Sequence, residues 1–286
     1  MLKLISILVA VDHQDFRLST TDSQTAGSPE RLKNSPERRK NSPERLKNSP
    51  ERRKNSPERR TKKNMDLAEN FKSLFEATNA VIGSELPITR WITMDIPGPT
   101  GALQAELTIA TDPGRDFAVL CHPHPQYGGN MHDMVLDCIA DVLLNTGISC
   151  LRFNFRGVGN SEGVSSGGAE EADDLLAVTT WLKAEHDPEN LWLGGYSFGA
   201  NMAWRTMSVI APDRLLLVAP PVGLMEFAEQ PLTMPVDIFT GDRDDYVDID
   251  KLSSLAGARV RTIAGADHFF MGYHDQLRQS IRDALS

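Results

Sequence analysis

Apolar residues recur in two alternating patterns along the chain beyond residue 85. Short runs rich in Val, Ile, Leu and Phe, typical of buried strands, lie near 89–96, 103–110, 117–121, 149–155, 191–195, 214–219, 235–240 and 258–263. Apolar residues spaced three and four apart predict helices over 133–144, 170–185, 199–210 and 273–285. This alternation predicts an α/β fold with a doubly wound, mostly parallel, eight-stranded sheet and an antiparallel edge formed by the first two strands.

One predicted strand ends in a serine between two glycines. The apolar run 191–193 leads into Gly195-Tyr196-Ser197-Phe198-Gly199, and a predicted helix follows. A serine hydroxyl is a weak nucleophile unless it is lifted clear of the backbone and given a base. A G-x-S-x-G turn lifts it, because the glycines relieve crowding around a strained backbone. Ser197 is therefore a candidate nucleophile, and an ordinary glycine- and serine-rich loop is the alternative.

An acid and a base follow the next strands. Four carboxylates come after the strand near 235–240, and they are Asp242, Asp244, Asp245 and Asp248. The strand near 258–263 leads into His268. Loops at the carboxyl edge of a parallel sheet converge on one crevice, so these side chains are expected to meet Ser197 there.

The chain order of serine, acid and histidine resembles that of the α/β-hydrolase superfamily, over about residues 85–286. The superfamily spacing G-x-x-D-x-x-V runs here from Gly241 to Val247 and selects Asp244 as the acid. Asp242 remains the main alternative. A cysteine nucleophile, as in dienelactone hydrolases, is excluded because Ser197 stands at the turn.

The resemblance implies a role for each residue. Ser197 would attack a carbonyl carbon, His268 would take and return its proton, and Asp244 would hold the imidazole. The backbone N–H groups of Phe198 and His124 are the expected oxyanion donors. Two further side chains are expected to line the substrate pocket, and they are Tyr127 and Tyr246.

His124 lies in a proline-rich loop after the strand near 117–121. Pro123 and Pro125 have no N–H, so His124 keeps the only amide between them. The His-Pro-His-Pro run followed by Tyr-Gly-Gly resembles a subgroup of small bacterial serine hydrolases. The H-x-H spacing is also a metal-ligand pattern, and a purely structural loop is the other alternative for His122. We expect no metal ion and no cofactor, because the serine triad already supplies the chemistry.

A second loop, Arg152–Gly163, resembles the superfamily's F-R-G-x-G-x-S loop, with Asn154 where many relatives carry aspartate. Arg156 is expected to brace this loop against carboxylates or carbonyls. The loop lacks the G-x-G-x-x-G spacing of a Rossmann turn and the lysine of a phosphate-binding loop, which disfavours a nucleotide site.

Composition fits one catalytic domain. The 286 residues are 40% hydrophobic, and Cys121, Cys138 and Cys150 lie in apolar stretches, as expected for reduced core cysteines of a cytoplasmic protein. Residues 220–234 leave no room for a lid domain, which favours small soluble acyl substrates. We expect a serine hydrolase that cleaves a small ester or thioester. An aminopeptidase-like hydrolase and a non-catalytic binding protein are the alternatives, and the oligomeric state stays open.

The first 64 residues differ from the rest. They contain five near-copies of a seven-residue unit, which start at Ser28, Ser35, Ser42, Ser49 and Ser56. Each unit holds a proline, which predicts disorder. Residues 1–64 carry a net charge of +8, which leaves −17 on residues 65–286. We expect residues 1–64 to be a low-complexity tail or a mis-assigned start, with the hydrolase domain at 65–286. If this basic tail is a genuine part of the protein, it is expected to bind nucleic acid. No membrane partner is expected.

Overall fold

A computed structural model describes residues 90–253, 255 and 257–286. The expectations for residues 1–64 lie outside these described residues. The strands are β1 (Arg90–Gly98), β2 (Gly101–Ile109), β3 (Asp116–Cys121), β4 (Ser149–Phe153), β5 (Asn190–Tyr196), β6 (Arg214–Val218), β7 (Val236–Gly241) and β8 (Arg259–Ile263). The helices are η1 (Pro125–Tyr127), α2 (Met134–Asn145), α3 (Glu171–His186), α4 (Phe198–Ile210), α5 (Ile249–Ser253) and α6 (His274–Leu285).

The described strands form one eight-stranded sheet in the order β1-β2-β4-β3-β5-β6-β7-β8. Strand β2 pairs antiparallel with both β1 and β4, and the pairs from β4 to β8 are parallel. The predicted doubly wound sheet with an antiparallel edge is therefore confirmed. After β3 the chain adds β4 on one side and β5 on the other, and ligands of such sheets bind outside the carboxyl ends at this reversal.

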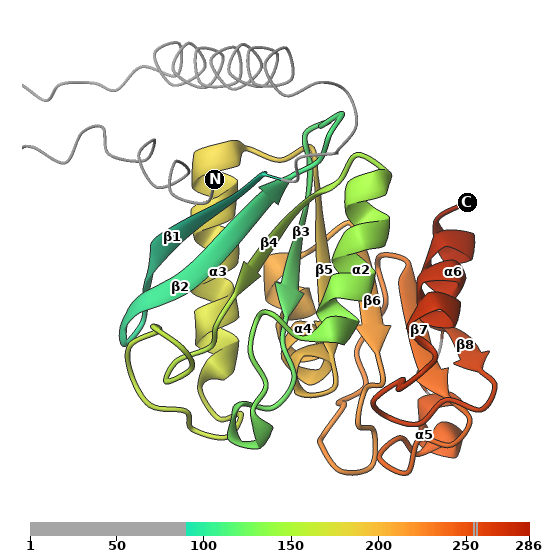
Figure 1. Cartoon of the computed structure of the whole chain (residues 1–286). Helices are drawn as coiled ribbons and strands as arrows, with labels where there is room; N and C mark the ends of the chain where they lie inside the picture. Colours follow the sequence, from blue (N-terminus) through green and yellow to red (C-terminus); the bar gives the residue numbers. More distant parts are fainter. Residues whose placement is uncertain (1–89, 254, 256) are drawn as a thin grey trace, which may run out of the picture. The chain divides into compact units, whose positions relative to one another are not determined.

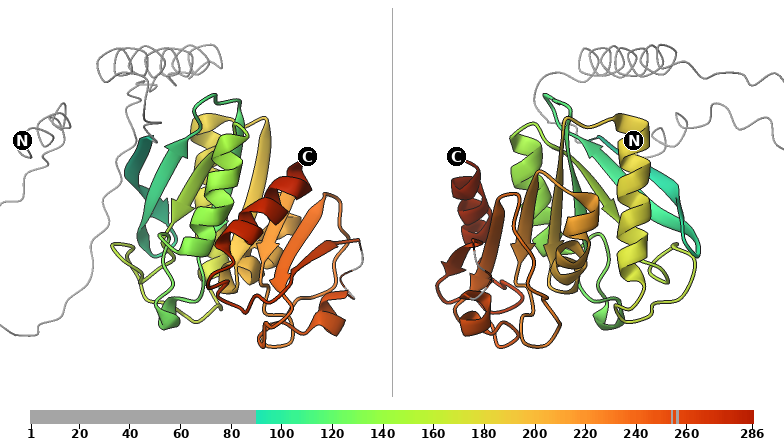
Figure 2. Two further views of the ribbon diagram at one scale, coloured as in Figure 1. Left: turned by 45° about the vertical axis from the view of Figure 1, so that its right-hand side comes forward. Right: turned by 180° about the vertical axis from the view of Figure 1, so that it is seen from behind.

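Helices cover both faces of the sheet. Helices α2 and α6 pack together on one face, and α3 and α4 pack together on the other (Figures 1 and 2). The parallel strands end at the lower edge of Figure 1, where α5 also lies. Loops that follow β3, β5, β7 and β8 therefore gather at one edge.

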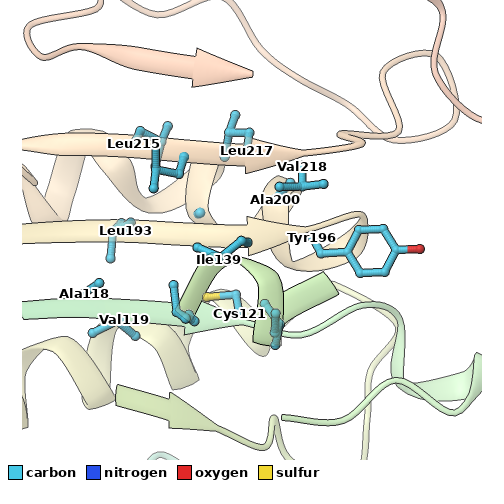
Figure 3. Packing of buried hydrophobic residues seen from close by; sticks show 14 of the residues in the cluster. Ala118, Val119, Cys121, Ile139, Leu193, Tyr196, Ala200, Leu215, Leu217 and Val218 are labelled. Carbon is cyan, nitrogen blue, oxygen red and sulfur yellow. The ribbon is translucent and has the colours of Figure 1, made fainter. Parts of the chain in front are cut away.

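The core explains the apolar runs. Strands β3, β5 and β6 are covered on both faces, so their residues are buried almost without interruption. Figure 3 shows Val119, Leu193 and Leu215 packed side by side on these neighbouring strands. All three cysteines are buried free thiols, as predicted. Burial raises the pKa of Cys138 to about 11, which keeps this thiol protonated and unreactive at neutral pH.

Two short elements escaped the sequence analysis, η1 and α5. Each is about one turn long, so neither contains an apolar period to detect. The connection between β6 and β7, residues 219–235, contains no helix and inserts no lid domain. Within the described part of the chain, no helix has both the length and the apolar character needed to cross a bilayer.

Candidate active site

The serine lies on a strained turn between β5 and α4. Ser197 has φ 53° and ψ −114°, a backbone conformation that residues other than glycine rarely adopt. A Cβ atom at Gly195 would overlap the backbone of Gly199, and one at Gly199 would overlap the carbonyl oxygen of Cys121. The Ser197 N–H donates to the Val218 carbonyl oxygen over 2.9 Å. The two glycines thus allow the sharp turn, and β6 holds it.

His268 and Asp244 complete a hydrogen-bonded line with this serine. The carboxylate of Asp244 only accepts, so His268 Nδ1 carries the proton, and it lies 2.9 Å from both carboxylate oxygens. His268 Nε2 then accepts from the Ser197 hydroxyl, 2.9 Å away. The Asp244 side chain is fully buried and the His268 side chain is 8% exposed, so water screens this line weakly.

Asp242, the alternative acid, has another partner. Its Oδ1 accepts a 2.6 Å hydrogen bond from the N–H of Gly265 and so joins the turn after β7 to the turn after β8. The structure therefore places Asp244, and not Asp242, against His268.

Tyr196 holds the histidine from the other side, and the sequence analysis gave it no role. Its hydroxyl donates to the backbone carbonyl oxygen of His268 over 3.0 Å. Burial raises the pKa of Tyr196 well above its ordinary value, so the phenol stays a neutral donor. Figure 3 shows its side chain extending beyond the end of β5. Tyr196 occupies a variable position of the G-x-S-x-G pattern, which carries no signal for this contact.

The two expected oxyanion donors lie on neighbouring segments. Phe198 is the first residue of α4, where backbone N–H groups have no partner within the helix. The His124 carbonyl oxygen accepts from the N–H groups of Tyr127 and Gly129, both over 3.1 Å, which fixes the loop around it. The rings of His124 and Phe198 pack edge to face with centroids 4.8 Å apart. Within the described residues, no hydrogen-bond acceptor is recorded for either N–H group.

His122 has a structural environment. It is fully buried, its Nδ1 lies 2.6 Å from the Pro123 carbonyl oxygen, and its Nε2 accepts from the Phe155 N–H over 3.0 Å. Burial lowers the pKa of His122 to about 4, so the ring is neutral at physiological pH. Both nitrogens are engaged by the backbone, which leaves neither for a metal ion. Among the described residues, no group of three or more His, Cys, Asp or Glu side chains has the arrangement of a metal site.

The loop after β4 is braced as expected. Arg156 is 2% exposed and pairs with Asp174 over 2.8 Å and with Glu170. Asn154 accepts from the Met131 N–H over 2.9 Å and donates to the Gln104 side chain over 2.8 Å. These contacts tie the loop to α3 and to the segment before α2.

Three exposed aromatic side chains lie beside two histidines of the candidate site. The Tyr246 ring lies 4.6 Å from the His268 ring and is 46% exposed, while Tyr127 is 88% exposed and lies 5.1 Å from the His124 ring. The structure thus places these two expected pocket residues on different sides, one by the histidine and one by the proline-rich loop. Phe269, which the sequence analysis did not select, lies 5.5 Å from the His268 ring and is 54% exposed.

Comparison with known proteins identifies the family. A family model described as alpha/beta hydrolase fold matches residues 119–220, from β3 to just beyond β6. An alpha-beta serine hydrolase homologue from Coxiella burnetii is 32% identical, and the match covers 71% of this chain and 100% of that chain with a TM-score of 0.66. The chain belongs to the α/β-hydrolase family.

Two further relatives of this α/β hydrolase have similar identity. The crystal structure of a serine hydrolase without lid from Xanthomonas campestris is 32% identical, covers 71% of this chain and 96% of that chain, and gives a TM-score of 0.65. An uncharacterised protein of Rickettsia prowazekii (strain Madrid E) is 32% identical over 209 residues, which cover 66% of this chain and 86% of that protein. The fold and the two serine-hydrolase relatives support hydrolase activity.

Proposed function

We propose that this protein is a serine hydrolase that cleaves small esters or thioesters through an acyl-enzyme. The observation that carries the proposal is the hydrogen-bonded line from Ser197 through His268 to Asp244, built on a strained turn at the carboxyl edge of the sheet. A strained backbone persists only where the surrounding structure enforces it, and such positions cluster at active sites.

The geometry supports acyl transfer in two steps. The Ser197 oxygen attacks the substrate carbonyl carbon while His268 Nε2 accepts the hydroxyl proton, and the carbonyl oxygen becomes an oxyanion. The N–H groups of Phe198 and His124 are the proposed donors to that oxyanion. His268 then returns the proton to the leaving alcohol or thiol. A water molecule repeats the sequence on the acyl-enzyme and releases the acid.

Asp244 and Tyr196 position the histidine in this scheme. Asp244 fixes the tautomer with the proton on Nδ1 and stabilises the imidazolium that forms during attack. Tyr196 anchors the backbone of His268. The absence of an inserted lid domain between β6 and β7, within the described residues, leaves the site open and favours small soluble substrates over lipid aggregates.

A fluorophosphonate probe tests this proposal directly, because it modifies a serine only when that serine is activated. We expect covalent labelling of one serine per chain in the wild-type protein and loss of labelling in Ser197→Ala. Ser208→Ala is the matched control, since Ser208 is an exposed serine of α4 and should leave labelling unchanged. Thermal melting establishes that each variant is folded.

A folded wild-type protein that resists labelling would contradict the proposal and favour a binding role. A short-chain p-nitrophenyl ester, compared with aminoacyl arylamides, then separates the esterase from an aminopeptidase. We expect the ester to be the better substrate in kcat/KM.

A further inference from the structure

Two exposed aromatic side chains flank the histidine of the proposed triad. Tyr246 follows β7 and Phe269 follows β8, and about half of each side chain faces solvent. Their rings lie 6.2 Å apart at an interplanar angle of 77°, an edge-to-face geometry. The His268 ring lies 4.6 Å from Tyr246 and 5.5 Å from Phe269. The three rings thus form one aromatic cluster, in which Tyr246 and Phe269 are about half exposed to solvent and His268 is buried.

Hydrogen bonds fix the backbone that carries the two exposed rings. The N–H of Tyr246 donates to Asp244 Oδ1 over 2.9 Å, and the N–H of Phe269 donates to Asp267 Oδ1 over 3.1 Å. The next residue, Phe270, is fully buried with φ 54° and anchors the turn. Exposed aromatic rings on fixed backbone lose little entropy when a ligand packs on them, which is typical of binding sites.

Chemistry indicates which part of a substrate reaches these rings. His268 Nε2 returns a proton to the atom that leaves the carbonyl carbon, so that atom must lie within hydrogen-bond distance of Nε2. The substituent attached to the leaving atom then passes the ring system around His268. Tyr127 contacts His124 instead and belongs to the side of the proposed oxyanion donors.

We propose that Tyr246 and Phe269 form a leaving-group subsite that binds the uncharged apolar or aromatic alcohol of an ester substrate. This assignment rests on the proposed hydrolytic function. It narrows the substrate class, because an ester of an aromatic alcohol gains contacts with these rings that an ester of methanol lacks.

Charge around the cluster disfavours an anionic leaving group. Asp245 adjoins Tyr246, Asp267 lies two residues before Phe269, and both acidic residues are exposed. Among the exposed residues of the two segments 242–250 and 267–269, carboxylates outnumber cations. The cation is Arg243, and the carboxylates are Asp242, Asp245, Asp250 and Asp267. The phosphates of a coenzyme A thioester would meet a repulsive field here.

The experiment compares leaving groups on one acyl group. We would measure kcat/KM for benzyl acetate and methyl acetate in the wild type, Tyr246→Ala and Phe269→Ala. Trp91→Ala is the matched control, because Trp91 is an aromatic residue 63% exposed on β1, on the edge strand of the sheet. Comparing the benzyl-to-methyl ratio between variants cancels the intrinsic reactivity of each ester.

We expect each alanine variant at the cluster to lower the benzyl-to-methyl ratio about fivefold to tenfold, and Trp91→Ala to leave it unchanged. Phe269→Tyr should restore most of the ratio, because it keeps an aromatic ring. Fluorophosphonate labelling releases fluoride and does not occupy an alcohol subsite, so labelling of the wild-type protein tests the hydrolytic function separately from the subsite. S-benzyl thioacetate should react at least about tenfold faster than acetyl-coenzyme A.

Unchanged ratios in both alanine variants, with labelling and hydrolysis intact, would overturn the subsite while leaving the hydrolytic function in place. Faster hydrolysis of acetyl-coenzyme A than of the neutral thioester would overturn the assigned charge preference. A folded wild-type protein that shows neither labelling nor hydrolysis would overturn the hydrolytic function, and the subsite with it.

Discussion

Asp244 receives hydrogen bonds from two directions. His268 Nδ1 lies 2.9 Å from both of its oxygens, and the Tyr246 N–H donates to Oδ1. The same carboxylate therefore orients the imidazole and fixes the backbone of an aromatic residue beside it. The carboxylate of Asp242, two positions earlier, accepts instead from the N–H of Gly265. The two acids lie close together in the sequence, but their carboxylates have different hydrogen-bond partners in the fold.

Asp244→Asn should lower kcat about 10³–10⁴-fold, because an amide donor at Nδ1 favours the imidazole tautomer that cannot accept the Ser197 proton. Asp242→Asn should stay within about twofold of wild type, since its amide oxygen still accepts from Gly265. Steady-state hydrolysis of a p-nitrophenyl ester measures both. Equal losses in the two variants would remove Asp244 from its assigned role.

Single residues were predictable where local sequence carries the signal. Ser197 was predictable from its flanking glycines, and His268 from its place after the last strand. Tyr196 and Phe269 were not, because their roles depend on contacts made across the fold. The Tyr196 hydroxyl, for example, bonds to a residue 72 positions away. No local spacing encodes such a contact.

At the scale of elements, the close approach of α4 to the loop after β3 determines the active-site geometry. Gly199, in the first turn of α4, lies where any Cβ would overlap the carbonyl oxygens of Cys121 and His122. These carbonyls belong to backbone at the start of the proline-rich loop. The absence of a side chain at Gly199 thus brings the proposed nucleophile, Ser197, and the proposed oxyanion loop together.

Gly199→Ala should therefore lower the free energy of unfolding by about 3 kcal/mol or more, because the overlapping atoms are backbone and cannot move as a side chain does. Gly114→Ala is the control. A Cβ there would meet its nearest heavy atom at 3.9 Å, so the change should stay within about 0.5 kcal/mol. Urea unfolding followed by circular dichroism measures both, and similar stability of the two variants would refute the packing argument.

Element boundaries followed from sequence because strands and helices here are long enough to show their periods. The predicted ends of these elements lie within two residues of those in the structure. Helices η1 and α5 were missed, since one turn of helix has no repeat to recognise. The pairing order of the strands also needs the family resemblance or the structure, because alternation alone allows several orders.

Across the whole molecule, two buried ionisable groups link stability to pH. His122 stays neutral in the folded state because burial lowers its pKa to about 4. Burial alone would raise the pKa of Glu171, but hydrogen bonds from Ser166, Ser165 and the Gly168 backbone lower it to about 2. Protons bind the unfolded chain more readily than the folded one at both sites. Acid therefore destabilises the protein, through His122 below about pH 6.5 and through Glu171 below about pH 4.5.

Glu171 also connects the loop before α3 to the active site. Each carboxylate oxygen accepts two hydrogen bonds of 2.7–2.8 Å, from Ser165, Ser166 and the N–H of Gly168. A Cβ atom at Gly168 would lie 3.2 Å from the Phe198 ring, so the loop packs closely on the residue that carries a proposed oxyanion donor. This arrangement depends on an ionised, acceptor-only side chain.

Glu171→Gln should lower the free energy of unfolding by about 2–3 kcal/mol at pH 7, because an amide loses charge-assisted hydrogen bonds and adds a donor where donors already converge. The variant lacks the titrating group, so the difference from wild type should narrow as pH falls from about 4.5 toward 2. Asp173→Asn, at an exposed carboxylate of the same helix, should show a small difference at every pH. Urea midpoints between pH 7 and pH 3 measure the trend. A gap that stays constant over this range would show that Glu171 stabilises the loop by shape rather than by charge.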